Sequence, residues 1–373
     1  MGFGAAFDLA RNSTDVELIT VADHDVSKAD LIASSLGGGV RSVHLDATDA
    51  DSASALFAEH DAVISCVNYW HNEALSRLAI KTGIHFCDLG GNNYVVDKQL
   101  SMDSEAKEAG INIIPDCGLA PGMVSILAMH GFQFFDSVDD IQIRVGGLPQ
   151  NPKPPLDYQL IFSVEGLINE YIESARVIRD GGITEVESMT ELETIVFDGF
   201  PELEAFQTSG GTSTLPETFK GRVRNLDYKT IRYAGHCVKF KAMIDLGLCD
   251  SDKQIIAGEN SVTPRVFFAS LLESNLPSGE ADLVLVRVTV RGVENGKRRV
   301  RTFDIVDRMD EKNNLSSMMR MTAFPASIIA QMMIKGETKR IGAIPQELAI
   351  DSTRFISELS RRGIEIQESS KEN

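Results

Sequence analysis

Two aspartates follow apolar runs at positions where a carboxylate could do chemistry. Asp88 follows the run 84–87, and Asp116 follows the run 111–115 and begins a loop rich in Gly and Pro. A carboxylate at the end of a buried strand is costly unless it binds a partner, so each could hold a substrate ammonium group and take up its proton. The alternative is that each only caps a turn, because Asp near Gly is a common turn sequence.

Arg232 is the candidate for binding a substrate carboxylate, because a guanidinium can donate two parallel hydrogen bonds to one. The alternative is a surface salt bridge, since most arginines are exposed. The Ser-, Thr- and Gly-rich loop 208–214 could offer N–H and hydroxyl groups to the same carboxylate. His236, at the start of a predicted helix, either lines this site or caps that helix.

The beginning of the sequence is typical of the second half of a dinucleotide-binding unit. Residues 1–11 show helical apolar spacing, and residues 16–22 form an apolar run that ends at Asp23, 21 positions after Gly2. This is about the spacing between the glycine fingerprint and the ribose-binding carboxylate, although Asp23 could also be a simple turn former. The first strand and phosphate loop of such a unit are not seen, so we expect a sheet that lacks its first strand.

The alternation of helix and strand continues up to residue 114. Strands are predicted over 41–45, 61–67, 84–88 and 111–114, and each ends in polar or Gly-rich residues. Because parallel strands share one carboxyl edge, where open α/β sheets bind ligands, these ends predict a binding site. Asp46 and Ala47 would lie near the adenine, with a plain turn as the alternative. Cys66, Val67, Asn68 and Tyr69 would lie along the pyrophosphate and nicotinamide.

The second half of the sequence has a different pattern. Residues 140–146, 227–233, 283–291 and 299–307 read as strands, and Glu294-Asn295-Gly296-Lys297 is a hairpin turn signal. They predict a mixed sheet with helices on one face. Helices are predicted over 316–335 and 352–362, followed by a frayed polar tail from residue 367. We therefore expect domains over 1–122 and 123–315, and C-terminal helices over 316–373 that return to the first domain.

The bulk composition narrows the class of protein. A length of 373 residues suggests two domains, and the net charge of −18 makes nucleic acid or an anionic membrane an unfavourable partner. No run approaches the ~20 apolar residues of a membrane span, and no secretory leader is seen. The five cysteines include no Cys-x-x-Cys pair and the histidines show no metal-binding spacing. We therefore expect a protein of the reducing cytoplasm without a metal site.

Five segments resemble the saccharopine dehydrogenase-like family, and they occur in the same order over nearly the whole chain. These segments are 88–91, 116–123, 162–167, 208–215 and 229–236. The resemblance implies an α/β fold, in which a Rossmann-type doubly wound parallel sheet is joined to a mixed α+β substrate domain. It also implies a homo-oligomer and a nicotinamide cofactor. The implied reaction is oxidation of the ε-amino carbon of lysine, giving ammonia and 2-aminoadipate 6-semialdehyde, which cyclises.

NAD is favoured over NADP, because a 2′-phosphate beside Asp23 and Asp25 would meet like charge. The expected catalytic residues are Asp88 and Asp116. The residues expected to bind substrate are Tyr69, Phe162, Ser163, Thr208, Ser209, Thr212, Arg232 and His236. The residues expected to bind the cofactor are Gly2, Asp23, Asp46, Ala47, Cys66, Val67, Asn68, Leu89, Gly90 and Pro121.

Two other functions remain open. A saccharopine or carboxynorspermidine dehydrogenase would keep the fold and act on a secondary amine. Because saccharopine has three carboxylates, its site would need several arginines, and beside Arg232 only Arg144 and Arg224 are further candidates. A non-catalytic dinucleotide-binding protein is the alternative of another class.

Overall fold

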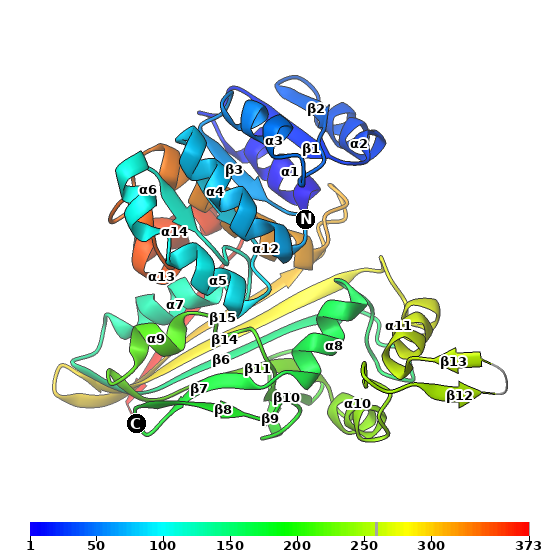
Figure 1. Ribbon diagram of the computed structural model, residues 1–373. Helices are drawn as coiled ribbons and strands as arrows, with labels where there is room; N and C mark the ends of the chain where they lie inside the picture. Colours follow the sequence, from blue (N-terminus) through cyan, green and yellow to red (C-terminus); the bar gives the residue numbers. More distant parts are fainter. Residues whose placement is uncertain (258–259, 373) are drawn as a thin grey trace. The chain divides into compact units, whose positions relative to one another are not determined.

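The computed structural model describes residues 1–257 and 260–372, and the chain forms two compact units (Figure 1). The first comprises residues 1–133 and 319–366, and the second comprises residues 134–318 and the chain from Gln367 on. The first unit thus extends 11 residues beyond the expected boundary at 122, because the helix after it packs against the C-terminal helices. The last residues return to the second unit rather than to the first.

In the first unit helices and strands alternate, as the sequence predicts. Its elements are α1 (Gly2–Asn12), β1 (Ile19–Asp23), α2 (Val26–Leu36), β2 (Val40–His44), α3 (Ala50–Phe57), β3 (Ala62–Ser65), the 3-10 turn η1 (Tyr69–His71), α4 (Asn72–Thr82), β4 (His85–Asp88), α5 (Asn93–Leu100), α6 (Asp103–Ala109), β5 (Asn112–Ile114) and α7 (Met123–Phe132), followed after the second unit by α12 (Ser317–Ile334), β16 (Gly342–Ala343), α13 (Gln346–Ala349) and α14 (Ser352–Arg361).

The parallel sheet of this unit is in two pieces. One piece has the order β16-β5-β4-β3, and the other is the pair β1-β2. Among the described residues no strand pairs with the free edge of β1 or of β3.

Burial explains why these strands form. Every residue of β5 is buried, as predicted for a strand covered on both faces. Phe86 of β4 and Ile113 of β5 pack with Leu75 and Ala79 of α4 in one apolar cluster. Helix α7 is apolar on nearly every side and almost wholly buried, and within the unit it packs against α13 and α14.

The second unit is a mixed sheet with helices. Its elements are β6 (Ser137–Pro149), α8 (Val164–Ile172), β7 (Ala175–Arg179), β8 (Gly182–Val186), β9 (Glu193–Ile195), β10 (Leu203–Gln207), α9 (Leu215–Phe219), β11 (Val223–Tyr233), α10 (His236–Asp245), β12 (Ile255–Ala257), β13 (Asn260–Val262), α11 (Pro264–Asn275), β14 (Asp282–Glu294), β15 (Lys297–Arg308) and β17 (Gln367–Glu372).

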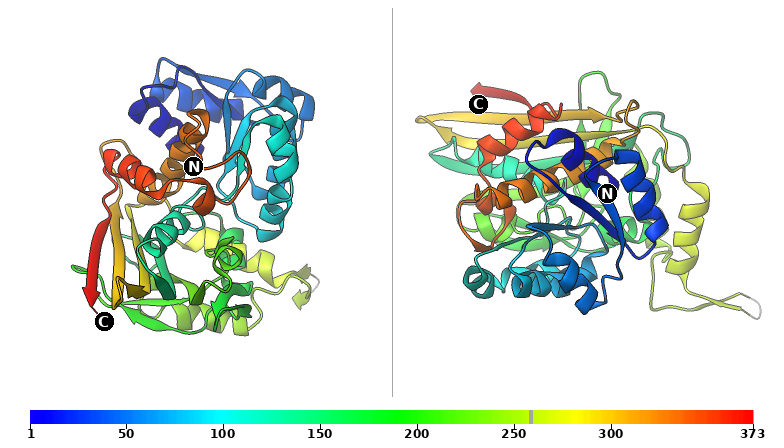
Figure 2. Two further views of the ribbon diagram at one scale, coloured as in Figure 1. Left: turned by 90° about the vertical axis from the view of Figure 1, so that its left-hand side faces the viewer. Right: turned by 90° about the horizontal axis from the view of Figure 1, so that it is seen from above.

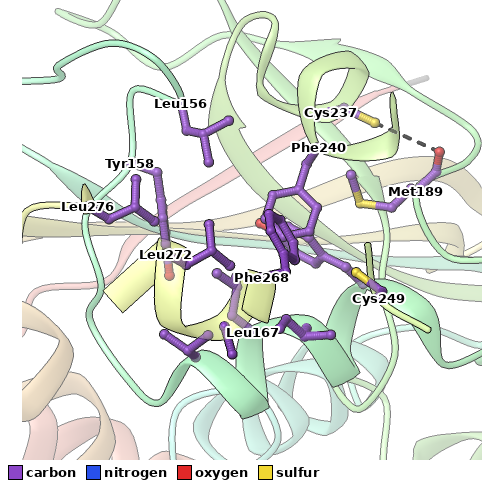
Figure 3. Packing of buried hydrophobic residues seen from close by; sticks show 14 of the residues in the cluster. Leu156, Tyr158, Leu167, Met189, Cys237, Phe240, Cys249, Phe268, Leu272 and Leu276 are labelled. Atoms are coloured by element: carbon purple, nitrogen blue, oxygen red, sulfur yellow. Dashed lines mark hydrogen bonds between the residues drawn. The ribbon is translucent and has the colours of Figure 1, made fainter. Parts of the chain in front are cut away.

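The main path of this sheet runs β17-β15-β14-β6-β11-β10-β9. The predicted hairpin joins β14 to β15, and Asn295 and Gly296 both have positive φ, as a type I′ turn requires. Helices α8, α10 and α11 pack on one face through Leu167, Phe240 and Phe268 (Figure 3). The sheet and this apolar layer position the side chains described next.

The expectation of a frayed tail was wrong for residues 367–372, which form the edge strand β17 paired with β15. The tail is exposed, but its acidic side chains face basic ones on the neighbouring strand. Arg301 is paired with Glu368, and Lys297 with Glu372 at 2.9 Å. Residue 373 lies outside the described part of the chain.

Candidate functional site

Asp88 ends β4 and is fully buried. Its Oδ1 accepts the N–H groups of Gly90 (2.7 Å) and Asp116 (3.1 Å), and its Oδ2 accepts the side-chain amide of Gln99 (2.6 Å). Burial raises the pKa of Asp88, and these hydrogen bonds oppose the rise. The carboxylate therefore holds together the loops after β4 and β5, which is the capping role considered as its alternative.

Asp116 lies in the loop after β5 with a φ of 59°, a backbone conformation that few non-Gly residues adopt. It is 1% exposed. A Cβ atom on Gly90 would lie 1.8 Å from its Oδ1, so only glycine fits there. The structure thus brings the two predicted carboxylates onto adjoining loops at the carboxyl edge of the sheet.

Arg232 lies in β11 and is buried in the second unit. Its Nε donates to the Tyr171 hydroxyl at 2.8 Å, and one terminal nitrogen donates to the carbonyl of Ile231. The guanidinium lies 4.9 Å from the centre of the Tyr158 ring. Among the described residues no carboxylate pairs with it. Arg232 therefore does not form the surface salt bridge that was considered as the alternative.

His236, the first residue of α10, is also buried and contacts protein groups through both ring nitrogens. The Leu156 carbonyl lies 2.9 Å from Nδ1 and can only accept, so Nδ1 carries the proton. Nε2 then accepts from the Tyr171 hydroxyl at 3.1 Å. Burial and the nearby Arg232 lower the pKa of His236 to about 3. A neutral His236 thus orients the tyrosine whose oxygen accepts from Arg232.

Glu170, which the sequence analysis did not single out, is next to Tyr171 on α8. Its Oε1 accepts the hydroxyls of Thr230 (2.7 Å) and Thr208 (3.3 Å), and these two hydroxyls are 2.7 Å apart. Thr230 and Arg232 are two positions apart on β11 and face the same side of the sheet. A glutamate on an amphipathic helix gives no sequence signal beyond its type, so only the tertiary contact reveals it.

The hydroxyls of the predicted 208–214 loop are used mostly by the protein itself. Besides Thr208, Ser209 donates to the carbonyl of Asn169, and Thr212 donates to the carbonyl of Arg176 at 2.8 Å. Ser163 caps α8 by accepting the N–H of Gly166. Phe162 is partly exposed before it. Of the predicted substrate residues in this unit, Arg232 keeps hydrogen-bonding capacity that the described residues leave unused.

The residues predicted to bind a dinucleotide lie at the expected element ends of the first unit. Gly2 opens α1, which has no side-chain cap, and a Cβ on Gly2 would lie 3.9 Å from that of Cys66. Free N–H groups at a helix start favour an anion. Asp23 ends β1 and its Oδ1 accepts the N–H of Asp25 at 2.9 Å, whereas Asp25 caps α2. These positions suit a pyrophosphate and a ribose.

The remaining predicted cofactor residues fall into three groups. Asp46 holds a turn, because its Oδ1 accepts from the backbone and side chain of Thr48, and Ala47 lies within that turn. Cys66 follows β3, and burial raises the pKa of its thiol to about 11, which favours the protonated thiol. The other residues are partly or largely exposed at the carboxyl edge: Val67, Asn68, Tyr69, Leu89, Gly90 and Pro121.

In the described part of the chain, no group of three or more His, Cys, Asp or Glu side chains could hold a metal ion. No helix within residues 1–257 and 260–372 is long and apolar enough to span a membrane.

The two units and these residues define a dinucleotide-binding α/β protein with a separate mixed α/β unit. The model of the saccharopine dehydrogenase NADP binding domain matches residues 1–114, and that of the saccharopine dehydrogenase C-terminal domain matches residues 118–364. The chain belongs to the saccharopine dehydrogenase family, a family of oxidoreductases.

Relatives and solved structures agree with this family. The chain is 21% identical to the saccharopine dehydrogenase [NADP(+), L-glutamate-forming] of Schizosaccharomyces pombe, over 94% of this chain and 93% of that protein. It is 26% identical to the Pyricularia oryzae enzyme of the same name, over 60% of this chain and only 51% of that protein. The saccharopine dehydrogenase structure from Saccharomyces cerevisiae has the same fold, with a TM-score of 0.82 at 20% identity over 100% of this chain and 98% of that one.

Proposed function

We propose that the protein is an NAD-dependent lysine 6-dehydrogenase. It would oxidise the carbon that bears the ε-amino group of L-lysine, and water would convert the resulting imine to 2-aminoadipate 6-semialdehyde and ammonia. The observation that supports this substrate is Arg232, a buried guanidinium that no carboxylate of the described residues contacts directly, although Glu170 interacts with it electrostatically. A buried charge without a direct ion partner is costly, so we expect an anionic ligand group to pair with it.

Lysine suits a site with a single available arginine, because it has a single carboxylate. The other two candidate arginines are already paired. Arg144 contacts Asp227 at 2.8 Å, and Arg224 contacts Asp180 at 3.0 Å. Arg144 is therefore not available for a further carboxylate of a larger substrate, whereas the pair of Arg224 is exposed and holds that arginine only weakly.

When bound, the nicotinamide would accept the hydride from the ε-carbon of lysine. Residues of the chain itself would bind the substrate and take its proton. In the second unit, Arg232 would bind and orient the α-carboxylate of the substrate. Asp116 would take the proton of the ε-ammonium group, because a neutral amine is needed for oxidation. Asp88 would keep the loop of Asp116 in place through the N–H bond between them.

We propose NAD rather than NADP as the cofactor, on the basis of Asp23. Its carboxylate can accept hydrogen bonds from ribose hydroxyls, and it would repel a 2′-phosphate. The family model carries NADP in its description, so the cofactor needs a direct comparison.

Saccharopine is the second candidate substrate, and a specific observation favours it. The Schizosaccharomyces pombe relative, similar over 94% of this chain, is a saccharopine dehydrogenase. This function would require additional cationic groups for the two further carboxylates of saccharopine.

One experiment separates these functions. Purified protein is mixed with lysine or saccharopine and with NAD or NADP, and the absorbance of the reduced cofactor is followed. Our proposal expects the highest kcat/KM with lysine and NAD. Turnover of saccharopine alone would favour the second candidate. Cofactor binding without turnover of either substrate would indicate a dinucleotide-binding protein.

A further inference from the structure

We infer that Glu170 binds the α-ammonium group of the substrate, so that Glu170 and Arg232 together recognise the free α-amino acid end. This inference rests on the proposed function, and it adds a specificity-determining residue. It is based on the carboxylate of Glu170 and the guanidinium of Arg232, which lie on the same face of the second unit but do not form an ion pair with each other.

Two adjacent residues of α8, Glu170 and Tyr171, make the contacts that position these two charged groups. Tyr171 accepts from Arg232, and its chain neighbour Glu170 accepts from Thr230. Thr230 and Arg232 project from one face of β11 about 7 Å apart along the strand. Helix α8 and strand β11 are therefore joined by two neighbouring side-chain contacts, one at the carboxylate and one at the guanidinium.

Each charged group is only partly used by the protein. Oε1 of Glu170 takes both threonine hydroxyls, whereas no donor in residues 1–257 or 260–372 contacts Oε2. The guanidinium of Arg232 donates to a hydroxyl and a carbonyl but to no carboxylate of the same residues. The threonine contacts fix the orientation of Glu170 and leave one oxygen for a ligand.

An α-amino acid presents an ammonium group and a carboxylate on a single carbon. Such a zwitterion can contact a carboxylate and a guanidinium at the same time, and each charge of the ligand then meets its opposite. A monocarboxylate without an α-amino group would form an ion pair with Arg232 but would offer no ammonium group to Glu170. Charge-assisted hydrogen bonds are the stronger kind, so this difference should be measurable.

A purely structural role for Glu170 is the alternative, because it also joins α8 to β11 through the threonines. Glu170→Gln separates the two roles. The amide oxygen still accepts from both hydroxyls, but the side chain loses its charge. Glu173→Gln, an exposed position one turn later at the end of α8, is the matched control.

The experiment compares L-lysine with 6-aminohexanoate, which keeps the carboxylate and the distal amine but lacks the α-amino group. We expect Glu170→Gln to raise KM for lysine about 10- to 100-fold, as for loss of one hydrogen bond to a charged group. The KM for 6-aminohexanoate and kcat for both compounds should stay within about twofold. The control variant should match the wild type with both compounds.

The outcomes distinguish this inference from the proposed function. Equal changes of KM for the two compounds, or no change for lysine, would overturn the role of Glu170 while lysine oxidation by the wild type still stood. Calorimetric titration with both compounds gives the same comparison where turnover is absent. A wild-type protein that neither oxidises nor binds lysine would overturn both.

Discussion

Asp8 and Arg362, 354 positions apart in the sequence, form an ion pair of 2.7 Å that is buried on both sides. The hydroxyl of Ser327 also donates to Asp8, and Arg362 contacts Glu358 at 2.7 Å. This network joins α1, α12 and α14 within the first unit.

Asp8→Ala should lower the free energy of unfolding by up to about 3–5 kcal/mol, because it leaves the buried Arg362 charge with Glu358 as its remaining ion partner and removes the acceptor of the Ser327 hydroxyl. Urea unfolding measures this change. Asp15→Ala is the control, since the pair of Asp15 with Lys335 at 2.6 Å is exposed and should contribute little to stability. Equal losses in the two variants would contradict the importance of burial.

Arg232→Ala should raise KM for lysine by a factor that corresponds to about 2–4 kcal/mol, because the buried ion pair with the carboxylate is lost. For a simple alkylamine, which has no carboxylate, KM should change far less. Steady-state kinetics with both compounds test this. If both KM values rose equally, or neither changed, Arg232 would be structural and our placement of the substrate would be wrong.

Asp116→Asn should lower kcat by about 10²- to 10⁴-fold with little effect on KM, because an amide cannot take the ammonium proton. Asp88→Asn should instead lower mainly the free energy of unfolding, since Asp88 holds three donors of the protein. Kinetics and urea unfolding of both variants give the comparison. An unchanged kcat in Asp116→Asn would remove this residue from the reaction.

Asp23→Ala should reduce the preference for NAD over NADP, because it removes both the ribose contact and the repulsion of a 2′-phosphate. The ratio of kcat/KM for the two cofactors is the readout. Asp46→Ala, in a turn that contacts Thr48, should change this ratio less. Equal use of both cofactors by the wild type would contradict the role of Asp23.

His236 should make the protein less stable in acid. Its pKa is about 3 when folded and about 6.5 in an unfolded chain, so between these values the unfolded state binds a proton that the native state does not. Stability contributed by neutral His236 is present above pH 6.5 and is lost as pH falls toward 3, by up to ~1.4 kcal/mol per pH unit. Urea unfolding between pH 7 and 5 should show a steeper loss for the wild type than for His236→Gln. Parallel curves would contradict this assignment.

Local sequence signals predicted much of the fold. The Asn295-Gly296 pair sets both the turn and the register of β14 and β15, because only residues that tolerate positive φ suit it. The apolar run before Asp116 predicted a buried strand, and every residue of β5 is buried. These features depend on neighbours in the sequence.

Features that depend on distant partners could not be predicted. Residues 367–372 lack the apolar alternation of a strand, and they form one because β15 supplies basic side chains about 70 positions earlier. Glu170 is unremarkable until Thr208 and Thr230 are brought beside it by the sheet. Asp88 and Asp116 looked equivalent in sequence, and the structural role of Asp88 is seen only in the three hydrogen bonds that it accepts from other loops and helices.

The long separation of Asp8 and Arg362 has a consequence for biosynthesis. At roughly 5–20 residues per second, the ribosome adds Arg362 about 20–70 s after Asp8. During elongation α1 is therefore made well before α12 and α14, the helices that pair with the Asp8 carboxylate in the complete chain. Residues 134–318 contain all of the described second unit except the edge strand β17, and they are translated before residues 319–366. The first unit, although begun first, therefore becomes complete only after nearly all of the second unit has been made.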